Sequence, residues 1–158
     1  MRIATPEAKF IRPADTTAYA DGDLVANDTD IADVVPLKFT VGGQNVGIMI
    51  RRARLRTSTT NVTLASFRLH LFTNKPTPAV ADNAALVVSD TPGYLGYFDF
   101  TLSAAFADGA VVHAVPAIGS EIVARVGDGA IYGLLQAKAG YTPASAQLFY
   151  VQLEVLLD

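Results

Sequence analysis

The chain has no cysteine and no tryptophan, and charged side chains make up only 17% of its 158 residues. Without cysteine it cannot be a disulfide scaffold, a zinc ribbon, an iron–sulfur protein or a thiol enzyme. The count of 12 Lys+Arg against 15 Asp+Glu gives a net charge of −3, which excludes the general basic surface of a nucleic-acid binder but leaves room for a local basic stripe. Apolar runs are too short to span a bilayer, and the N-terminal MRIATPEAKFIRPAD lacks the apolar region of a secretory signal. We therefore expect a cytoplasmically made, soluble protein with no membrane partner and no specific nucleic-acid ligand.

What the chain does have is short segments rich in β-branched and aromatic residues, separated by Gly, Pro, Asn and Asp at intervals of about ten residues. In 63–72 every second side chain is apolar, which predicts a strand with one buried face and one wet face. The expected strands are 22–26, 34–41, 46–57, 63–73, 94–101, 110–115, 121–126, 130–137 and 146–157. This pattern indicates an all-β fold, with a single antiparallel β-sandwich over 21–158.

Several features of this sandwich are less defined by the pattern. A jelly-roll-like or Greek-key topology and a partly closed barrel all fit the strands. We expect at most one or two short helical turns, with 79–88 and 103–108 as the candidates. Asp128-Gly129 is a tight-turn signal, so 121–126 and 130–137 are predicted to pair as a hairpin.

The first 20 residues differ from the rest and are predicted to form an extended N-terminal arm. Two prolines restrict its backbone, and Phe10 and Ile11 form a small apolar anchor beside Arg12. An arm of this kind either lies along its own domain or reaches a neighbouring molecule.

The densest charge cluster is RRARLR at 51–56, where Arg52, Arg54 and Arg56 share one face of a strand about 6.5–7 Å apart. The apolar side chains of this strand must change from one face of the sheet to the other near Arg51, which predicts a β-bulge there. Such a stripe suits carboxylates of a protein partner or phosphates; the alternative is a solvated face balanced by Asp and Glu of the adjacent strand. Arg68 and His70 widen the patch if their strand pairs with this one.

Three other groups of residues are candidates for metal binding, catalysis or ligand binding. The acidic residues within DGDLVANDTDIAD miss the spacing of a calcium loop, so we interpret them as turn formers and expect no metal. His70 and His113 lack a recognisable nucleophile setting, so we expect no enzyme, no catalytic residue and no cofactor. In YLGYFDF, Tyr94 and Phe98 should share a face with Phe100 and Tyr97 should lie opposite, as core, protein interface or a sugar-stacking platform.

These interpretations give a set of candidate protein-interface residues. They are Phe10, Ile11, Arg12, Arg52, Arg54, Arg56, Arg68, His70 and Tyr97.

The segments AYADGDLVAND, VVPLKFTV, IRRARLRTS, FRLHLF, ADNAALVVSD and YLGYFDF, in that order, resemble a family of small proteins encoded beside the major capsid protein in tailed bacteriophages. The resemblance spans residues 19–100 and the ending LFYVQLEVLLD. It implies a decoration or cement protein on the outer capsid surface of the virion, bound to the major capsid protein as a homo-oligomer, a trimer in preference to a dimer. It brings no catalytic residues. The alternatives are a carbohydrate- or receptor-binding module of a phage tail, and an enzyme in which a histidine gathers acidic neighbours in a pocket.

Overall fold

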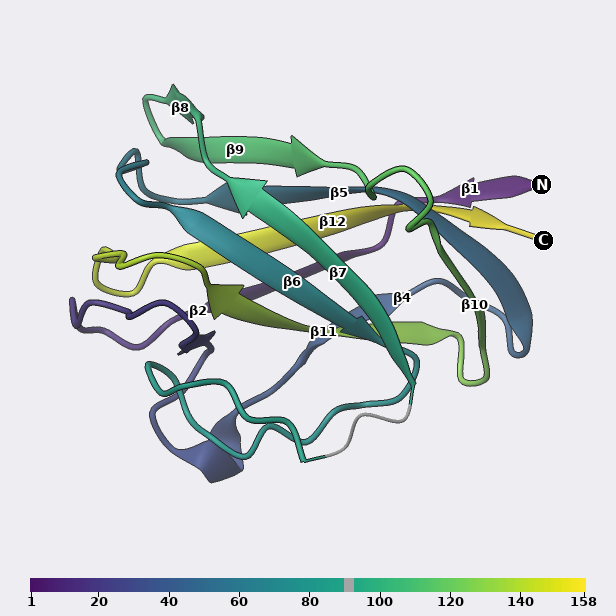
Figure 1. Ribbon diagram of the computed structural model, residues 1–158, viewed down its shortest axis with the longest axis horizontal. Helices are drawn as coiled ribbons and strands as arrows, with labels where there is room; N and C mark the ends of the chain where they lie inside the picture. Colours follow the sequence, from purple (N-terminus) through teal and green to yellow (C-terminus); the bar gives the residue numbers. More distant parts are fainter. Residues whose placement is uncertain (90–92) are drawn as a thin grey trace.

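Two antiparallel sheets packed face to face form the protein, as the computed structural model shows for residues 1–89 and 93–158 (Figure 1). The expected all-β sandwich is thereby confirmed. The elements are β1 (Arg2–Ala4), β2 (Glu7–Ile11), β3 (Leu24–Val25), the 3-10 turn η1 (Ile31–Asp33), β4 (Leu37–Thr40), β5 (Val46–Thr57), β6 (Ser66–Phe72), β7 (Tyr94–Thr101), β8 (Ala104–Phe106), β9 (Gly109–Ala114), β10 (Ile122–Val126), β11 (Ala130–Ala137) and β12 (Leu148–Leu157). Asp90, the last residue of the segment ADNAALVVSD, lies outside the described residues.

The first sheet is built around β12 and β5, which pair along most of their lengths. β1 and β2 follow one another along the free edge of β12, while β9 and β10 both pair with β5 on its other side. The second sheet is built around β11 and β6, with β3 and β4 along the other side of β11 and β7 beside β6.

Counting β1 with β2, β3 with β4, and β8 with β9 and β10, the chain has eight extended segments. The first, eighth, third and sixth lie side by side in the first sheet, and the second, seventh, fourth and fifth lie side by side in the second. This is the order of a jelly roll with its two Greek keys, one of the topologies that the sequence left open.

The predicted hairpin between 121–126 and 130–137 is wrong. β10 pairs with β5 in the first sheet, whereas β11 pairs with β3, β4 and β6 in the second. The Asp128-Gly129 turn therefore carries the chain from one sheet to the other. Gly129 has a φ of +71°, and its carbonyl accepts hydrogen bonds from the N–H groups of Val41 and Gly42, which ties the turn to the end of β4.

The N-terminal segment lies along its own domain. Residues of β1 and β2 are in register with β12, from Arg2 opposite Leu157 to Ile11 opposite Leu148. The helical turn falls at Ile31–Asp33, and neither predicted position is helical: 103–108 contains β8, and 79–88 is a loop with isolated bridges. Within the described residues, no helix is long and apolar enough to cross a membrane.

The main core fills the space between the sheets. Phe67 of the second sheet packs edge-on against Phe149 of the first, with ring centroids 5.4 Å apart, and against Tyr141 at 5.2 Å. A smaller cluster lies on the outer face of the second sheet, where Phe72 and Leu134 are covered by side chains from the loop between β6 and β7. β11 is thus buried on both faces, which explains its nearly continuous apolar sequence.

Candidate functional site

The three arginines of β5 project from the outer face of the first sheet because of a β-bulge at Arg51. Ile50 pairs with Val155 and Arg52 pairs with Glu154, so Arg51 is the extra residue of β5. Before the bulge the even-numbered Ile48 and Ile50 face the core; after it the odd-numbered residues do. The bulge predicted from the phase change is confirmed, and it turns Arg52, Arg54 and Arg56 outward.

One carboxylate from a neighbouring strand and one from a turn balance part of this arginine row. Arg52 lies 2.6 Å and Arg51 3.9 Å from Glu154 of β12, and Arg56 lies 3.0 Å from Asp108 in the β8–β9 turn. The predicted balance by acidic residues is therefore present at both ends of the row. These pairs are half exposed, so each stabilises the fold only weakly.

Arg54, in the middle of the row, is the exception. No carboxylate lies within ion-pair distance of it among the described residues, and its buried Nε has no hydrogen-bond partner there. Its guanidinium lies 6.0 Å from the centre of the Tyr150 ring. The pKa of the Tyr150 phenol is raised, chiefly by the Glu7 carboxylate.

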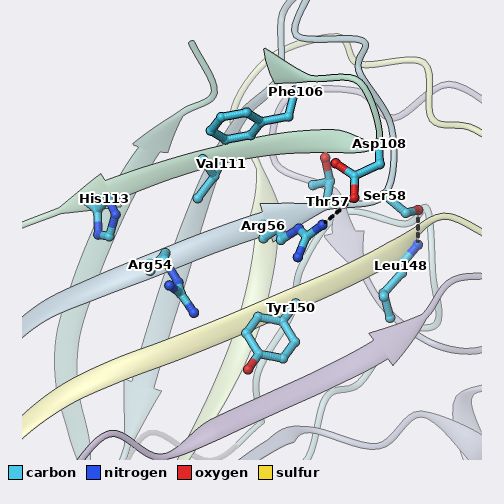
Figure 2. Close-up of a pocket in the computed structure, with 10 residues that line it drawn as sticks. All are labelled: Arg54, Arg56, Thr57, Ser58, Phe106, Asp108, Val111, His113, Leu148 and Tyr150. Carbon is cyan, nitrogen blue, oxygen red and sulfur yellow. Dashed lines mark hydrogen bonds and ion pairs between the residues drawn. The ribbon is translucent and has the colours of Figure 1, made fainter. Parts of the chain in front are cut away.

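A groove of about 710 Å³ opens over this part of the sheet. Figure 2 shows Arg54 and Arg56 from β5 and Tyr150 from β12 on its floor, with Val111 and His113 of β9 along one side. Its remaining lining residues are Thr57, Ser58, Phe106, Asp108 and Leu148. An open groove with an unpaired guanidinium next to an aromatic ring can bind a carboxylate through charge-assisted hydrogen bonds.

Arg68 and His70 do not extend the arginine row. They belong to β6, so they lie on the outer face of the second sheet, on the opposite side of the sandwich. The condition for a joint patch, pairing of β6 with β5, is therefore not met. Arg68 forms two hydrogen bonds to Asp99, at 2.7 and 2.8 Å, and stacks 3.8 Å from the centre of the Tyr97 ring. These hydrogen bonds lower the pKa of the Asp99 carboxyl.

His70 is held by hydrogen bonds at both ring nitrogens. Nε2 lies 3.0 Å from Oε1 of Gln136, whose amide nitrogen donates to the Gly22 carbonyl, so Oε1 is fixed as an acceptor and Nε2 carries the proton. Nδ1 then accepts from the Tyr94 hydroxyl at 3.1 Å. Burial is the main reason that the pKa of His70 is lowered, so the ring is neutral at physiological pH.

The Tyr94 contact corrects the prediction for YLGYFDF. Phe98 and Phe100 are buried and Tyr97 faces outward, as expected, but Tyr94 also faces outward. The register of β7 against β6 shifts between Leu71 and Phe72, and this irregularity turns Tyr94 to the side of His70.

The three N-terminal candidates have different surroundings. Phe10 stacks on Phe149 with centroids 5.4 Å apart, and Ile11 is 58% exposed. Arg12 is only 1% exposed, so its side chain is not available at the surface, and the prediction of an interface role for it is wrong.

Arg12 belongs to a buried cluster that the sequence did not reveal. Its Nε donates to the Tyr19 hydroxyl at 2.9 Å, and Nη2 lies 3.3 Å from Asp82 Oδ2. Tyr19 donates to Asp82 Oδ1 at 2.7 Å, and the same oxygen accepts from the Ala26 N–H at 2.8 Å. The cluster of Arg12, Tyr19 and Asp82, called the buried ion cluster below, joins the N-terminal segment to the loop between β6 and β7, which is more than 60 residues away in sequence.

The acidic segment 21–33 forms turns, as interpreted. Asp30 accepts from the Ala32 N–H and caps η1, and Asp28 accepts from the Asp30 N–H. Asn27 accepts from the Val35 N–H and donates to the Asp33 carbonyl, which closes the loop.

The fold and this geometry define a β-sandwich protein with an arginine-lined groove on one outer face. No family model matches the chain, and no curated protein matches it.

Proposed function

We propose that this protein is a virion structural protein that decorates the outer surface of a tailed-phage capsid and stabilises the lattice by bridging neighbouring capsid subunits. The resemblance of its sequence segments to capsid cement proteins motivates the proposal. The observation that carries it is the Arg54 guanidinium, which lies in an open groove without a carboxylate partner among the described residues. The major capsid protein would supply that carboxylate from an acidic surface loop.

The charges around the groove favour such a partner. This face carries four arginines, at positions 51, 52, 54 and 56, and only two carboxylates pair with them, those of Glu154 and Asp108. The chain as a whole, by contrast, has a net charge of −3. An acidic loop would therefore be attracted to this face more than to the rest of the surface.

The rigid sandwich also suits the role. A protein that binds only the assembled lattice stabilises it by mass action, and repeated contacts on one particle compensate for weak individual contacts. The first sheet holds the arginines on paired strands, so little order has to be gained when they bind.

Binding of Arg54→Ala to purified undecorated heads tests the proposal. We expect its affinity to fall about tenfold or more relative to the unchanged protein, since a charge-assisted hydrogen bond contributes roughly 1.5–3 kcal/mol. Lys75→Ala, which removes an exposed cation from the β6–β7 loop, should bind normally. Equal binding of both variants would remove the arginine groove from the contact, and failure of the unchanged protein to bind heads would refute the function.

Deleting the N-terminal segment is a poor test of contact with the capsid. β1 and β2 are paired with β12, and Arg12 belongs to the buried ion cluster, so the deletion removes part of the first sheet. A loss of binding by this variant could then result from loss of the fold and would not identify a capsid contact.

A carbohydrate- or receptor-binding module of a phage tail is the second candidate. The exposed ring of Phe106 and the ring of Tyr150 both line the groove, and aromatic faces beside polar groups are suited to sugars. Copy number separates the two: decoration predicts a count comparable with that of the capsid protein, whereas a tail module predicts a few copies per particle.

A further inference from the structure

The outer face of the first sheet is charged on one side of the bulge and apolar on the other. On the far side of Arg51 from the arginine row, four apolar residues lie in register across four strands. Ile3 of β1 is opposite Leu156 of β12, Leu156 is opposite Met49 of β5, and Met49 is opposite Val123 of β10. We call these four residues the apolar row.

The apolar row is open to solvent. Ile3 is 62% exposed, Met49 40% and Val123 63%, and Leu156 is half-buried between them. Neighbouring strands are about 4.8 Å apart, so the row extends for about 14 Å across the sheet. A continuous exposed apolar strip, unlike single exposed residues, is a surface on which another protein can bury apolar area.

Charged residues of both signs border the apolar row. Glu154 of β12 lies opposite Arg52 of β5, and this pair is next to the apolar row on the side of the bulge. At the other end, Arg125 of β10 is opposite Gly47, and the N–H of Asp158 donates to the Gly47 carbonyl. An apolar centre with a charged rim is the usual composition of a protein interface.

We propose that the apolar row binds the apolar row of a second copy of this chain, giving a two-fold symmetric dimer. The opposite charges of Glu154 and Arg52 beside the apolar row favour a second copy of this chain over a different protein, because they can pair across a two-fold axis. With a two-fold axis parallel to the strands and midway between β12 and β5, Met49 packs on Leu156 of the second copy and Ile3 packs on Val123 of the second copy. The same rotation brings Glu154 opposite Arg52 of the second copy.

This pairing makes the rim self-complementary, as an isologous contact requires. The two sheets would pack about 10 Å apart with aligned strands, which is the ordinary geometry of sheets stacked face to face. Arg56 is seven residues along β5 from Met49, or about 20 Å, so the apolar row and the groove occupy different parts of one outer face, and the evidence for the dimer does not depend on the proposed function.

Sedimentation velocity over a range of concentrations tests the dimer. The unchanged protein should sediment as a dimer, and Met49→Lys should raise the dissociation constant about tenfold or more, because an ammonium would be buried at the centre of the contact. Val87→Lys places the same charge at an exposed apolar position in the β6–β7 loop, and it should leave the dimer intact. An unchanged far-UV circular dichroism spectrum and a cooperative thermal transition of Met49→Lys show that the fold is kept.

Exchanging the charges of Glu154 and Arg52 supplies a second test of the dimer, which leaves the apolar row unchanged. Glu154→Arg alone and Arg52→Glu alone should each dimerise more weakly, because each places like charges opposite one another across the contact. A mixture of the two variants should form a heterodimer, because each now faces its opposite in the other copy. A monomer at every concentration, a trimer insensitive to Met49→Lys, or no gain on mixing would each overturn the proposal.

Discussion

Replacing Arg12 with methionine removes the guanidinium from the buried ion cluster and keeps most of the apolar stem. The Arg12 and Asp82 side chains are 0% and 1% exposed, so the remaining carboxylate would be buried without its cation. The carbonyls of Pro13 and Asp15 would also lose the hydrogen bonds that Nη1 donates to them. Breaking a buried ion pair by removing one partner costs about 3–5 kcal/mol, and whole domains are stable by about 5–15 kcal/mol.

We therefore expect Arg12→Met to lower the free energy of unfolding by about 3–5 kcal/mol, measured by urea unfolding followed by circular dichroism. Arg56→Met is the matched control, since it removes a half-exposed arginine from an ion pair outside the apolar row and its rim, and it should cost at most about 1 kcal/mol. The double variant Arg12→Met/Asp82→Asn should recover part of the loss, because it leaves no buried unpaired charge while an amide oxygen can still accept from Tyr19 and Ala26. A cost no larger than that of Arg56→Met would refute this reasoning.

The pH dependence of the same variant gives a further check. Burial is the main cause that raises the pKa of Asp82, and Arg12 opposes it. Without Arg12 the pKa of this carboxyl should be still higher in the folded state than in the unfolded state. The folded state then binds the proton more readily, so the stability deficit is complete above the folded-state pKa and shrinks as pH falls through it.

Two other perturbations have defined outcomes. Because the pKa of His70 is lowered in the folded state, chiefly by burial, the unfolded chain takes up a proton first as pH falls below about 6.5, and the free energy of unfolding should decrease there. His70→Gln should flatten this part of the pH profile, and an unchanged slope would contradict the assignment. Gly129→Ala should destabilise the fold by about 1 kcal/mol or more in urea unfolding, because of the positive φ and contact with the Gly43 carbonyl. Gly127→Ala, with open space around it, should cost less; equal costs would refute this account.

Residue alternation was sufficient to predict the strands whose two faces differ. In β5 even the bulge was visible, because the apolar positions change from even to odd numbers at Arg51. β11 was also located, although its apolar side chains are buried on both faces. These features are local, so the sequence of one segment is enough to show them.

Pairing between strands was predicted less well, because it depends on segments far apart in the chain. The Asp128-Gly129 turn has the composition of a hairpin turn, yet it crosses between the two sheets. Prolines 6 and 13 suggested an arm, but Pro6 lies between β1 and β2 and its carbonyl accepts from the Leu153 N–H. Both strands lie at the edge of a sheet, where proline is tolerated.

The candidate site was predicted in part for the same reason. The outward direction of Arg52, Arg54 and Arg56 followed from alternation within β5, and the groove over them required knowledge of β8, β9 and β12. Arg12 was assigned to an interface because it lies beside Phe10 and Ile11 in the expected arm, and arginine is usually exposed. Its burial depends on Asp82, which is 70 residues away and has no local signal.

The position of β12 has a consequence for biosynthesis. β12 follows every other strand in the chain, yet it lies inside the first sheet, between β5 and the pair β1 and β2. While the ribosome still holds these residues, β2 has no strand to pair with and β5 lacks one neighbour. The nascent polypeptide must therefore keep two unsatisfied strand edges apart from those of other nascent polypeptides until β12 has left the ribosome. Slowing translation of the codons for β12 should lower the yield of native protein by aggregation.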